Sequence, residues 1–361
     1  MKNSHAPLDL KKIKVQPLSK RKSLVALAEI LADPDQPAPP CSAEVLDSIG
    51  DCANRIKAAR ECGAAVILMF GAPLVMAGLQ SVVNRLIEHD LVTHLTTDGM
   101  GAIHDWEFAF FGRSGESVRD NIATGTFGAW NETGRNIHLA LLSGALNGQG
   151  FGQSVGQFIE NDGVTLPSPL TLEKDLRDAP SHPLAPARAE MLRAMTANKL
   201  SGGRIPVKHP HRKTSLLANA FRIGVPLTVH PGIGGDVLAT HPMFRGAVIG
   251  RAADFDFRLL GSSVERLASG VVLAVNSPIW ASQILETSLS CANNLRLQAE
   301  KSIVQDHSLF VVDSANRGTV EPQMNQSFSK IGGTMKQITS DSGAFLQHLL
   351  QQLTGHAVPP A

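Results

Sequence analysis

The stretch that decides the fold is Thr96-Thr97-Asp98-Gly99-Met100-Gly101-Ala102-Ile103-His104-Asp105-Trp106-Glu107. It begins in the last residues of a strand predicted over 91–97. Upstream, residues 65–70 (AVILMF) form a continuous apolar run, typical of a parallel strand buried on both faces. The pattern predicts a helix over 74–89 between the two strands and another helical stretch after Gly101. This strand–helix–strand alternation predicts an α/β fold with a doubly wound, mostly parallel sheet.

Later segments repeat the same unit. Residues 225–229 (VPLTV) precede a turn at 230–235, residues 270–275 (GVVLAV) precede a helix at about 278–300, and residues 308–312 (SLFVV) end at Asp313. The last helix is expected over 342–354, with Ser340 and Asp341 as candidate caps and Gly355 as its stop. Because right-handed crossovers bring the turns of such units to one edge, we expect a ligand site at the carboxyl edge of the sheet.

The chain is expected to have two parts, an N-terminal arm and a large domain. Residues 1–40 are interpreted as a solvated basic arm followed by a helix at 23–32, and residues 41–361 as a single large α/β domain. A Gly-rich stretch at 144–163 and a Pro-rich stretch at 165–187 predict loops, an excursion from the domain near 144–190.

Composition and sequence pattern disfavour several classes of function. The 361 residues carry 33 Lys plus Arg and 32 Asp plus Glu, a net charge of +1, so no bulk field gathers nucleic acid. Residues 63–84 hold no charge, but Gly71 and Pro73 divide them, so no membrane span is expected. The four cysteines have no zinc-ribbon spacing and are expected to be reduced, structural thiols. The N-terminus lacks a secretory signal, and a cytoplasmic location is expected.

Two turns carry the residues expected to bind a cofactor. Glycines let a backbone approach a pyrophosphate, and a strand-end carboxylate can accept hydrogen bonds from ribose hydroxyls. The candidates are Thr96, Thr97, Asp98, Gly99 and Gly101 in the first turn, and Gly235 and Asp236 in the second. Two such turns on one sheet edge suggest a dinucleotide. The alternative is a tight turn in which Asp98 only caps the following helix.

Three further side chains are candidates for acid–base chemistry. His104, Asp105 and Glu107 follow the first turn, and adjacent carboxylates can raise the pKa of an imidazole. The alternative is a capped, partly exposed first helical turn. Residues 208–213 (KHPHRK) resemble a metal or phosphate patch, but the proline favours an exposed turn, and no metal site is predicted.

Residues 91–146, especially TTDGMGAIHDWEFAFFG (96–112) and Gly134-Arg135-Asn136, resemble the NAD-binding core of deoxyhypusine synthases. Phe70-Gly71-Ala72-Pro73 is similar to that family's first nucleotide-contacting turn, residues 225–236 to its Ile-Pro-Val strand and Gly-Asp turn, and residues 270–272 to a later strand. The resemblance covers roughly residues 50–350 and implies a Rossmann-like domain that binds NAD at Gly71, the two turns and Asp313. The string AIHDWE (102–107) is also similar to ornithine cyclodeaminases that share this fold.

The same resemblance implies a chemistry. Ser327-Phe328-Ser329-Lys330 is similar to the Ser-Trp-Gly-Lys string whose lysine forms an imine in deoxyhypusine synthases, so Lys330 is the candidate imine residue. Phe328 stands where the family has Trp, and Gly224 where it has a substrate-site histidine. The implied activity is NAD-dependent oxidation of a small amine or amino acid, with aminoalkyl transfer to a protein lysine, in a homotetramer. Two alternatives are ornithine cyclodeaminase-like chemistry and a catalytically inactive relative that binds a nucleotide or only oligomerises.

Overall fold

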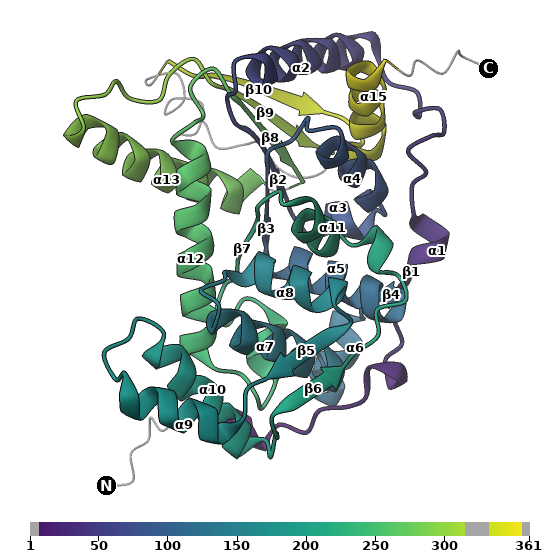
Figure 1. Ribbon diagram of the computed structural model, residues 1–361. Coiled ribbons are helices and arrows are strands. Elements are labelled where there is room, and N and C mark those ends of the chain that lie inside the picture. The colour runs from purple at the N-terminus through teal and green to yellow at the C-terminus, as the bar shows by residue number, and fades with distance from the viewer. Residues whose placement is uncertain (1–6, 277, 315–331, 356–361) are drawn as a thin grey trace, which may run out of the picture.

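The computed structural model describes residues 7–276, 278–314 and 332–355 (Figure 1). The chain folds into a mixed α/β structure in which most strands are followed by helices. The elements in chain order are η1 (Leu10–Lys12), η2 (Leu18–Lys20), β1 (Val25–Ala26), α1 (Leu27–Ile30), α2 (Ala43–Glu61), β2 (Val66–Phe70), α3 (Ala72–Met76), α4 (Gln80–Glu88), β3 (His94–Asp98), α5 (Gly99–Phe111), β4 (Arg113–Ser114), α6 (Val118–Thr124), α7 (Asn131–Ala145), α8 (Phe151–Glu160), β5 (Gly163–Leu166), α9 (Pro169–Asp178), α10 (Ala185–Ala197), β6 (Gly203–Pro206), η3 (Arg212–Thr214), α11 (Leu216–Ile223), β7 (Leu227–His230), η4 (Val237–Thr240), α12 (Gly246–Val264), β8 (Val271–Val275), α13 (Pro278–Gln298), β9 (Ser308–Asp313), β10 (Thr334–Thr339) and α15 (Ser342–Thr354).

The central sheet has six strands in the order β10-β9-β8-β2-β3-β7, and every neighbouring pair is parallel. From β2 in the middle, β3 and β7 follow one another outward on one side, and β8, β9 and β10 follow on the other. Numbered along the chain, the order is 6-5-4-1-2-3, the arrangement of doubly wound dinucleotide-binding folds. The predicted fold class is therefore confirmed.

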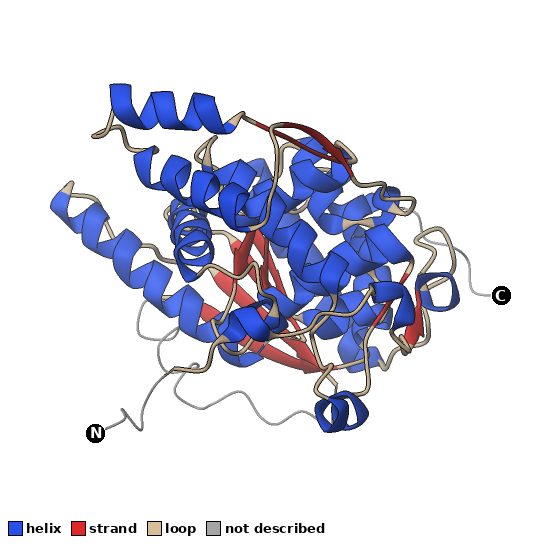
Figure 2. Cartoon of the chain, turned by 90° about the horizontal axis from the view of Figure 1, so that it is seen from below, coloured by secondary structure: helices blue, strands red, loops and turns tan. Residues whose placement is uncertain are grey.

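Helices cover both faces of the sheet (Figure 2). Alternate residues of β2, such as Leu68 and Phe70, face a large core formed with α2, α4, α5, α8, α11 and α15. The other residues, Ile67 and Met69, face a smaller core formed with α13 and the end of α12. Because β2 is apolar on both sides, its residues form a continuous hydrophobic run, as expected of a central parallel strand.

The N-terminal arm differs from the predicted solvated segment. The lysines of its described part are exposed, but Leu18 and Arg21 are buried at 1% and 7% exposure. The Gln16 backbone forms an isolated parallel β-bridge with that of Trp130, and β1 pairs with β4. The predicted helix at 23–32 is only α1, because β1 occupies the residues before it. The buried apolar residues of the arm and Arg21 therefore determine where it lies, and its exposed lysines do not.

The segment predicted as loops, residues 144–187, is largely helical. α8 and α9 lie within it and α10 starts there, and β5 pairs with β6 in a separate antiparallel sheet. The glycines of α8 serve close packing: a Cβ at Gly152 would lie 1.7 Å from the Leu227 carbonyl oxygen. The prolines Pro169 and Pro186 lie in the first turns of α9 and α10, where a missing N–H costs nothing.

Two other elements depart from the predictions. The helix expected over 74–89 is divided into α3 and α4 at Gly78, whose φ is +75° and whose Cβ would lie 2.1 Å from the Ile30 carbonyl oxygen of the arm. The sequence does not predict β10, whose side chains are mostly exposed, because TMKQIT lacks an apolar run. Among the described residues, no helix is both long and apolar enough to cross a membrane.

Candidate functional site at the carboxyl edge of the sheet

The strand order reverses direction between β2 and β8, and this switch point is where open α/β sheets bind ligands. Gly71 follows β2 and Asn276 follows β8. The two turns touch, since a Cβ at Gly71 would lie 2.7 Å from the Asn276 carbonyl oxygen. Asn276 has a φ of +52°, and its Nδ2 donates to Ser342 Oγ at 2.9 Å. Gly71 therefore lies at the switch point, and the nucleotide contact that the resemblance implies for it stays a prediction.

Asp98 is the last residue of β3 and the N-cap of α5. Its Oδ1 accepts a hydrogen bond from the Gly101 N–H at 2.6 Å. Burial raises the pKa of the carboxyl, while backbone N–H groups of Gly101, Met100 and Ala72 oppose that rise. Asp98 thus caps α5, as the alternative to cofactor binding predicts, and it also lies at the site edge next to Gly71.

Asp236 brings a second carboxylate to the same place. Its Oδ2 accepts from the Gly232 N–H at 2.7 Å, and this oxygen lies 2.1 Å from where a Cβ of Gly99 would be. Burial raises the pKa of Asp236 to about 6, and the charge of Asp98 adds to the effect. Two carboxylates, one at the end of β3 and one in the turn after β7, are therefore adjacent, as expected of two turns at one edge of the sheet.

The glycines of the first turn serve a purpose other than the one predicted. A Cβ at Gly99 would collide with the Asp236 carboxylate, and a Cβ at Gly101 would lie 2.2 Å from Thr97 Oγ1. These spaces are filled by protein atoms: Gly99 allows the second turn to pack against the first, and Gly101 leaves room for the Thr97 side chain of the same turn. In the second turn, the Gly235 N–H donates to the Gly232 carbonyl oxygen at 2.8 Å.

Two other strand ends contribute polar groups. Asp313 ends β9 at 6% exposure; its Oδ1 accepts from the Ser314 N–H, and its buried Oδ2 has no partner within the described part of the chain. His230 ends β7, and its ring stacks near Trp280 with centroids 6.3 Å apart. Burial lowers the pKa of His230 to about 4. His230 is absent from the residues predicted from the sequence, and its position at a strand end is the signal that could have identified it.

The hydroxyls of Thr96 and Thr97 are buried without a partner among the described residues, and the two side chains point to opposite faces of β3. Thr97 fills the space beside Gly101. Neither hydroxyl is accessible to a ligand. The two predicted cofactor contacts are therefore buried inside the protein, at the end of β3.

The three side chains predicted for acid–base chemistry have other partners. Asp105 is 2% exposed and accepts from Ser215 Oγ and from the N–H groups of Leu216 and Leu217 at 2.6–3.1 Å, so it caps α11. Burial raises the pKa of Asp105 to about 6, against those hydrogen bonds. These contacts give Asp105 a structural role that its position in the sequence does not reveal.

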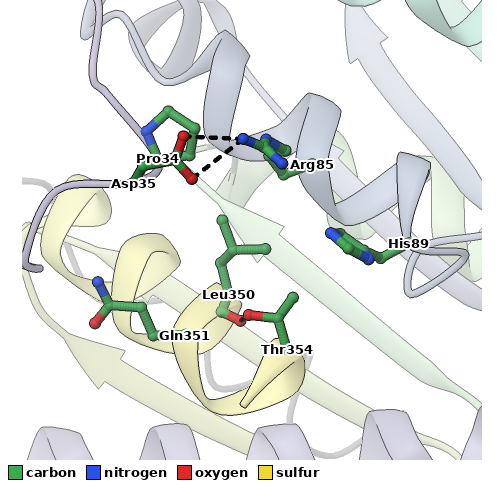
Figure 3. Close-up of a pocket in the computed structure, with 7 residues that line it drawn as sticks. All are labelled: Pro34, Asp35, Arg85, His89, Leu350, Gln351 and Thr354. Atoms are coloured by element: carbon green, nitrogen blue, oxygen red, sulfur yellow. Dashed lines mark hydrogen bonds and ion pairs between the residues drawn. The ribbon is translucent and has the colours of Figure 1, made fainter. Parts of the chain in front are cut away.

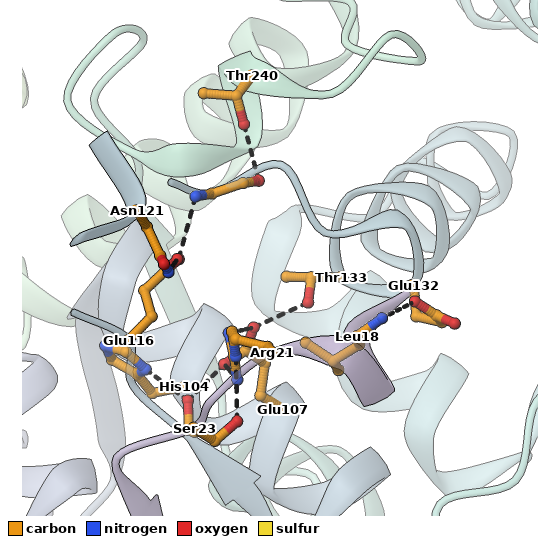
Figure 4. A network of polar contacts seen from close by, with 12 residues as sticks. Leu18, Arg21, Ser23, His104, Glu107, Glu116, Asn121, Glu132, Thr133 and Thr240 are labelled. Atoms are coloured by element: carbon orange, nitrogen blue, oxygen red, sulfur yellow. Dashed lines mark hydrogen bonds and ion pairs between the residues drawn. The ribbon is translucent and has the colours of Figure 1, made fainter. Parts of the chain in front are cut away.

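Glu107 lies in a buried network that Figure 4 shows around Arg21. Arg21 donates two hydrogen bonds to the Glu107 carboxylate at 2.7 and 2.8 Å, and both side chains are at most 3% exposed. Thr133 Oγ1 and Ser114 Oγ also donate to it, and His104 Nδ1 contacts Ser114 Oγ at 2.7 Å. Burial lowers the pKa of His104. Glu107 therefore anchors the N-terminal arm through Arg21.

Lys330 lies outside the described residues, so its predicted imine chemistry stays a prediction. Within the described ranges, no group of three or more His, Cys, Asp or Glu could hold a metal ion. The patch at 208–213 is not a simple exposed turn, because His209 is 2% exposed and contacts the rings of Trp106, Phe110 and Phe158.

A separate cavity of about 150 Å³ lies between the arm, α4 and α15 (Figure 3). Arg85 donates to both oxygens of Asp35 at 2.9 and 3.1 Å on one side of it, and Leu350 and Gln351 line the other. The residues of α4 and α15 that line the cavity lie near the C-terminal ends of these helices. In a parallel α/β unit these ends lie at the amino edge of the sheet, opposite the switch point.

No protein-family model matches the chain, and no curated protein matches it. Solved structures match across most of the chain with low scores. The ternary complex of AgrE with ornithine and NAD+ is 15% identical, with a TM-score of 0.44, over 89% of this chain and 34% of AgrE. A putative LOR/SDH protein from Methanococcus maripaludis S2 is 12% identical, with a TM-score of 0.43, over 89% of this chain and 71% of that one. A putative deoxyhypusine synthase from Entamoeba histolytica is 12% identical, with a TM-score of 0.39, over 87% and 90%.

The chain spans about a third of the length of AgrE. It spans a larger share of the other two proteins, most of all of the putative deoxyhypusine synthase. Similarity at this level describes the arrangement of helices and strands, and it carries no argument about the reaction of this protein.

Proposed function

We propose that this protein binds NAD across the carboxyl edge of its sheet and uses it to oxidise a small amine or amino acid. The observation that carries the proposal is the position of Gly71, Asp98 and Asp236 around the switch point between β2 and β8. When bound there, NAD supplies a hydride acceptor for a carbon that bears an amino group.

The chemistry of the donor set supports a dinucleotide. Asp98 and Asp236 present carboxylate oxygens, which accept hydrogen bonds from ribose hydroxyls. Asp236 Oδ1 makes no hydrogen bond with the described residues and is available for such a contact. The orphaned Oδ2 of Asp313 is a further buried acceptor at this edge. Because the adjacent carboxylates would repel a 2′-phosphate, we propose that NAD is preferred over NADP.

The finer statements rest on the sequence resemblance. Lys330 would form the imine with an aminoalkyl group, a protein lysine would be the acceptor, and the chain would assemble as a homotetramer. The competing candidate is a nucleotide-binding relative without catalysis. It is favoured by one observation: Asp105 and Glu107, two of the predicted acid–base residues, are committed to a helix cap and to Arg21.

A thermal-shift and turnover screen tests the proposal. NAD, NADH and NADP are each combined with spermidine and with ornithine, and NADH formation is followed by its absorbance. We expect NAD to raise the melting temperature more than NADP does, and one of the two amines to yield NADH. Binding of NAD without NADH from either amine would favour the non-catalytic candidate. Absence of any shift with NAD or NADH would contradict the assigned site.

A further inference from the structure

One face of the sheet buries apolar side chains in one half and polar side chains in the other. On the side of α12 and α13, β2 and β8 bury apolar side chains such as Ile67 and Val272. On the same side, β3 and β7 bury His94, Thr96 and Thr228, and end at Asp98 and His230. Burying polar groups costs free energy unless they are paired or used. We call His94, Thr96, Thr228 and His230 the polar stripe.

Most of the polar stripe forms one continuous chain of hydrogen bonds. Ser263 Oγ of α12 lies 2.8 Å from His94 Nδ1, and His94 Nε2 lies 3.0 Å from Thr228 Oγ1. Thr228 Oγ1 lies 3.3 Å from His230 Nε2. The chain therefore connects a fully buried histidine to a histidine at the carboxyl edge of the sheet.

The protons available to these side chains allow the hydrogen bonds only two consistent arrangements. The Thr228 hydroxyl has one proton, so it can donate to only one of the two histidines. If Thr228 donates to His94 Nε2, His94 Nδ1 donates to Ser263, and His230 Nε2 donates to Thr228, which leaves His230 Nδ1 unprotonated. If every bond reverses, His230 Nδ1 carries the proton. In the first arrangement His230 Nδ1 can accept a proton, and in the second it can only donate one.

The surroundings keep both rings neutral near pH 7. Burial lowers the pKa of His94 to about 3, and the charges of His230 and Arg266 act in the same direction. His230 pairs in register with Asp98, faces the ring of Trp280, and lies in the turn that leads to Asp236. Its Nδ1 makes no hydrogen bond with the described residues. A neutral imidazole with one free nitrogen at a ligand site is suited to accept a proton.

We propose that the hydrogen-bonded chain Ser263–His94–Thr228–His230 holds His230 in the tautomer whose Nε2 carries the proton, and that His230 Nδ1 is the proton acceptor at the ligand. The inference rests on the proposed function. There, a primary ammonium substrate becomes an iminium of the same charge, because it loses a hydride from the carbon that bears the nitrogen and a proton from the nitrogen itself. The hydride goes to NAD, which becomes NADH, and His230 Nδ1 accepts the proton. His230 then carries the added charge as an imidazolium whose Nε2 proton stays hydrogen-bonded to Thr228, while His94 stays neutral.

Replacement of Thr228 isolates the role of the hydrogen-bonded chain, because Thr228→Val removes the hydroxyl and keeps the shape. Thr228→Ser restores the hydroxyl, and Thr196→Val is a control at an exposed helical threonine of α10. With NAD and either ornithine or spermidine, we expect Thr228→Val to lower kcat roughly 10- to 100-fold, a part of what a general base contributes. Thr228→Ser should recover most of this loss, and the calorimetric Kd for NAD should not change.

A second readout needs no substrate. In protein labelled with ¹⁵N-histidine, His94 and His230 should each show one dominant tautomer at pH 7 in the wild type and in Thr228→Ser. In Thr228→Val both should become mixtures, because the group that couples them is gone. Unchanged tautomers in Thr228→Val, or turnover equal to that of Thr228→Ser, would overturn this role of the hydrogen-bonded chain. If neither amine is oxidised by the wild type, the proposed function fails, and the tautomers alone decide the role of the hydrogen-bonded chain.

Discussion

Replacing Arg21 by alanine is expected to lower the free energy of unfolding by about 3–5 kcal/mol, one of the largest effects of any single substitution in this chain. The guanidinium is 3% exposed and donates two hydrogen bonds to Glu107, which is 2% exposed. Its removal leaves a buried carboxylate with Ser114 and Thr133 as its remaining donors. Chemical denaturation of Arg21→Ala measures the loss, and Lys22→Ala, an exposed neighbour, is the matched control.

A double-mutant cycle separates the ion pair from the packing around it. Glu107→Ala alone leaves a buried guanidinium and should also be strongly destabilising, while Arg21→Ala with Glu107→Ala should cost less than the sum of the two. A loss in Arg21→Ala no larger than that in Lys22→Ala would mean that the arm is solvated, as its lysines suggested. Additive effects would mean that the two groups do not interact.

The second large effect is expected at Asp105, where alanine should destabilise the fold by about 3 kcal/mol and leave NAD affinity unchanged. Among the described residues, the carboxylate is the cap of the N–H groups of Leu216 and Leu217, and each buried donor left unpaired costs about 1–3 kcal/mol. Denaturation of Asp105→Ala gives the loss, with Asp254→Ala, at an exposed position of α12, as the control.

This substitution also discriminates between the two roles of Asp105. A structural cap predicts that Asp105→Ala lowers stability and that any remaining folded protein binds NAD normally by calorimetry. If stability is unchanged and only turnover is lost, Asp105 is a catalytic residue, as the sequence alone predicted, and its assignment as a cap of α11 is wrong.

The fold could be predicted from the sequence because its central strands are apolar throughout. The buried runs at 65–70, 270–275 and 308–312 lie within one or two residues of β2, β8 and β9, since a strand covered on both faces exposes no residue to water. The final helix begins and ends where Asp341 and Gly355 predicted. β10 was missed because an exposed edge strand has no such run, and the helices near 150 and 170 were missed because glycine and proline there serve packing and first turns.

The positions of the turns that form the site could be predicted from the sequence, but the partners of its side chains could not. The turns after two predicted strands gave Asp98 and Asp236 and the resemblance gave Gly71, and these residues lie at one edge because the topology of a parallel sheet brings such turns together. The partners of Asp105 and Glu107 could not be predicted, since Ser215 and Arg21 are distant in sequence and belong to segments with no periodic pattern of their own. His230 was not predicted because its link to His94 passes through the buried face of two strands.

Calorimetric titration of NAD into the wild type and into Asp98→Ala tests the central claim most directly, with Asp254→Ala as the control for loss of a carboxylate elsewhere. A hydrogen bond to a charged group contributes about 1.5–3 kcal/mol, so we predict one NAD site per chain and at least roughly tenfold weaker binding in Asp98→Ala. Asp254→Ala should bind as the wild type does, and a melting curve confirms that each variant is folded. Equal NAD affinity in folded Asp98→Ala and wild type, or no binding of NAD by the wild type, would contradict the claim that the cofactor lies at this edge of the sheet.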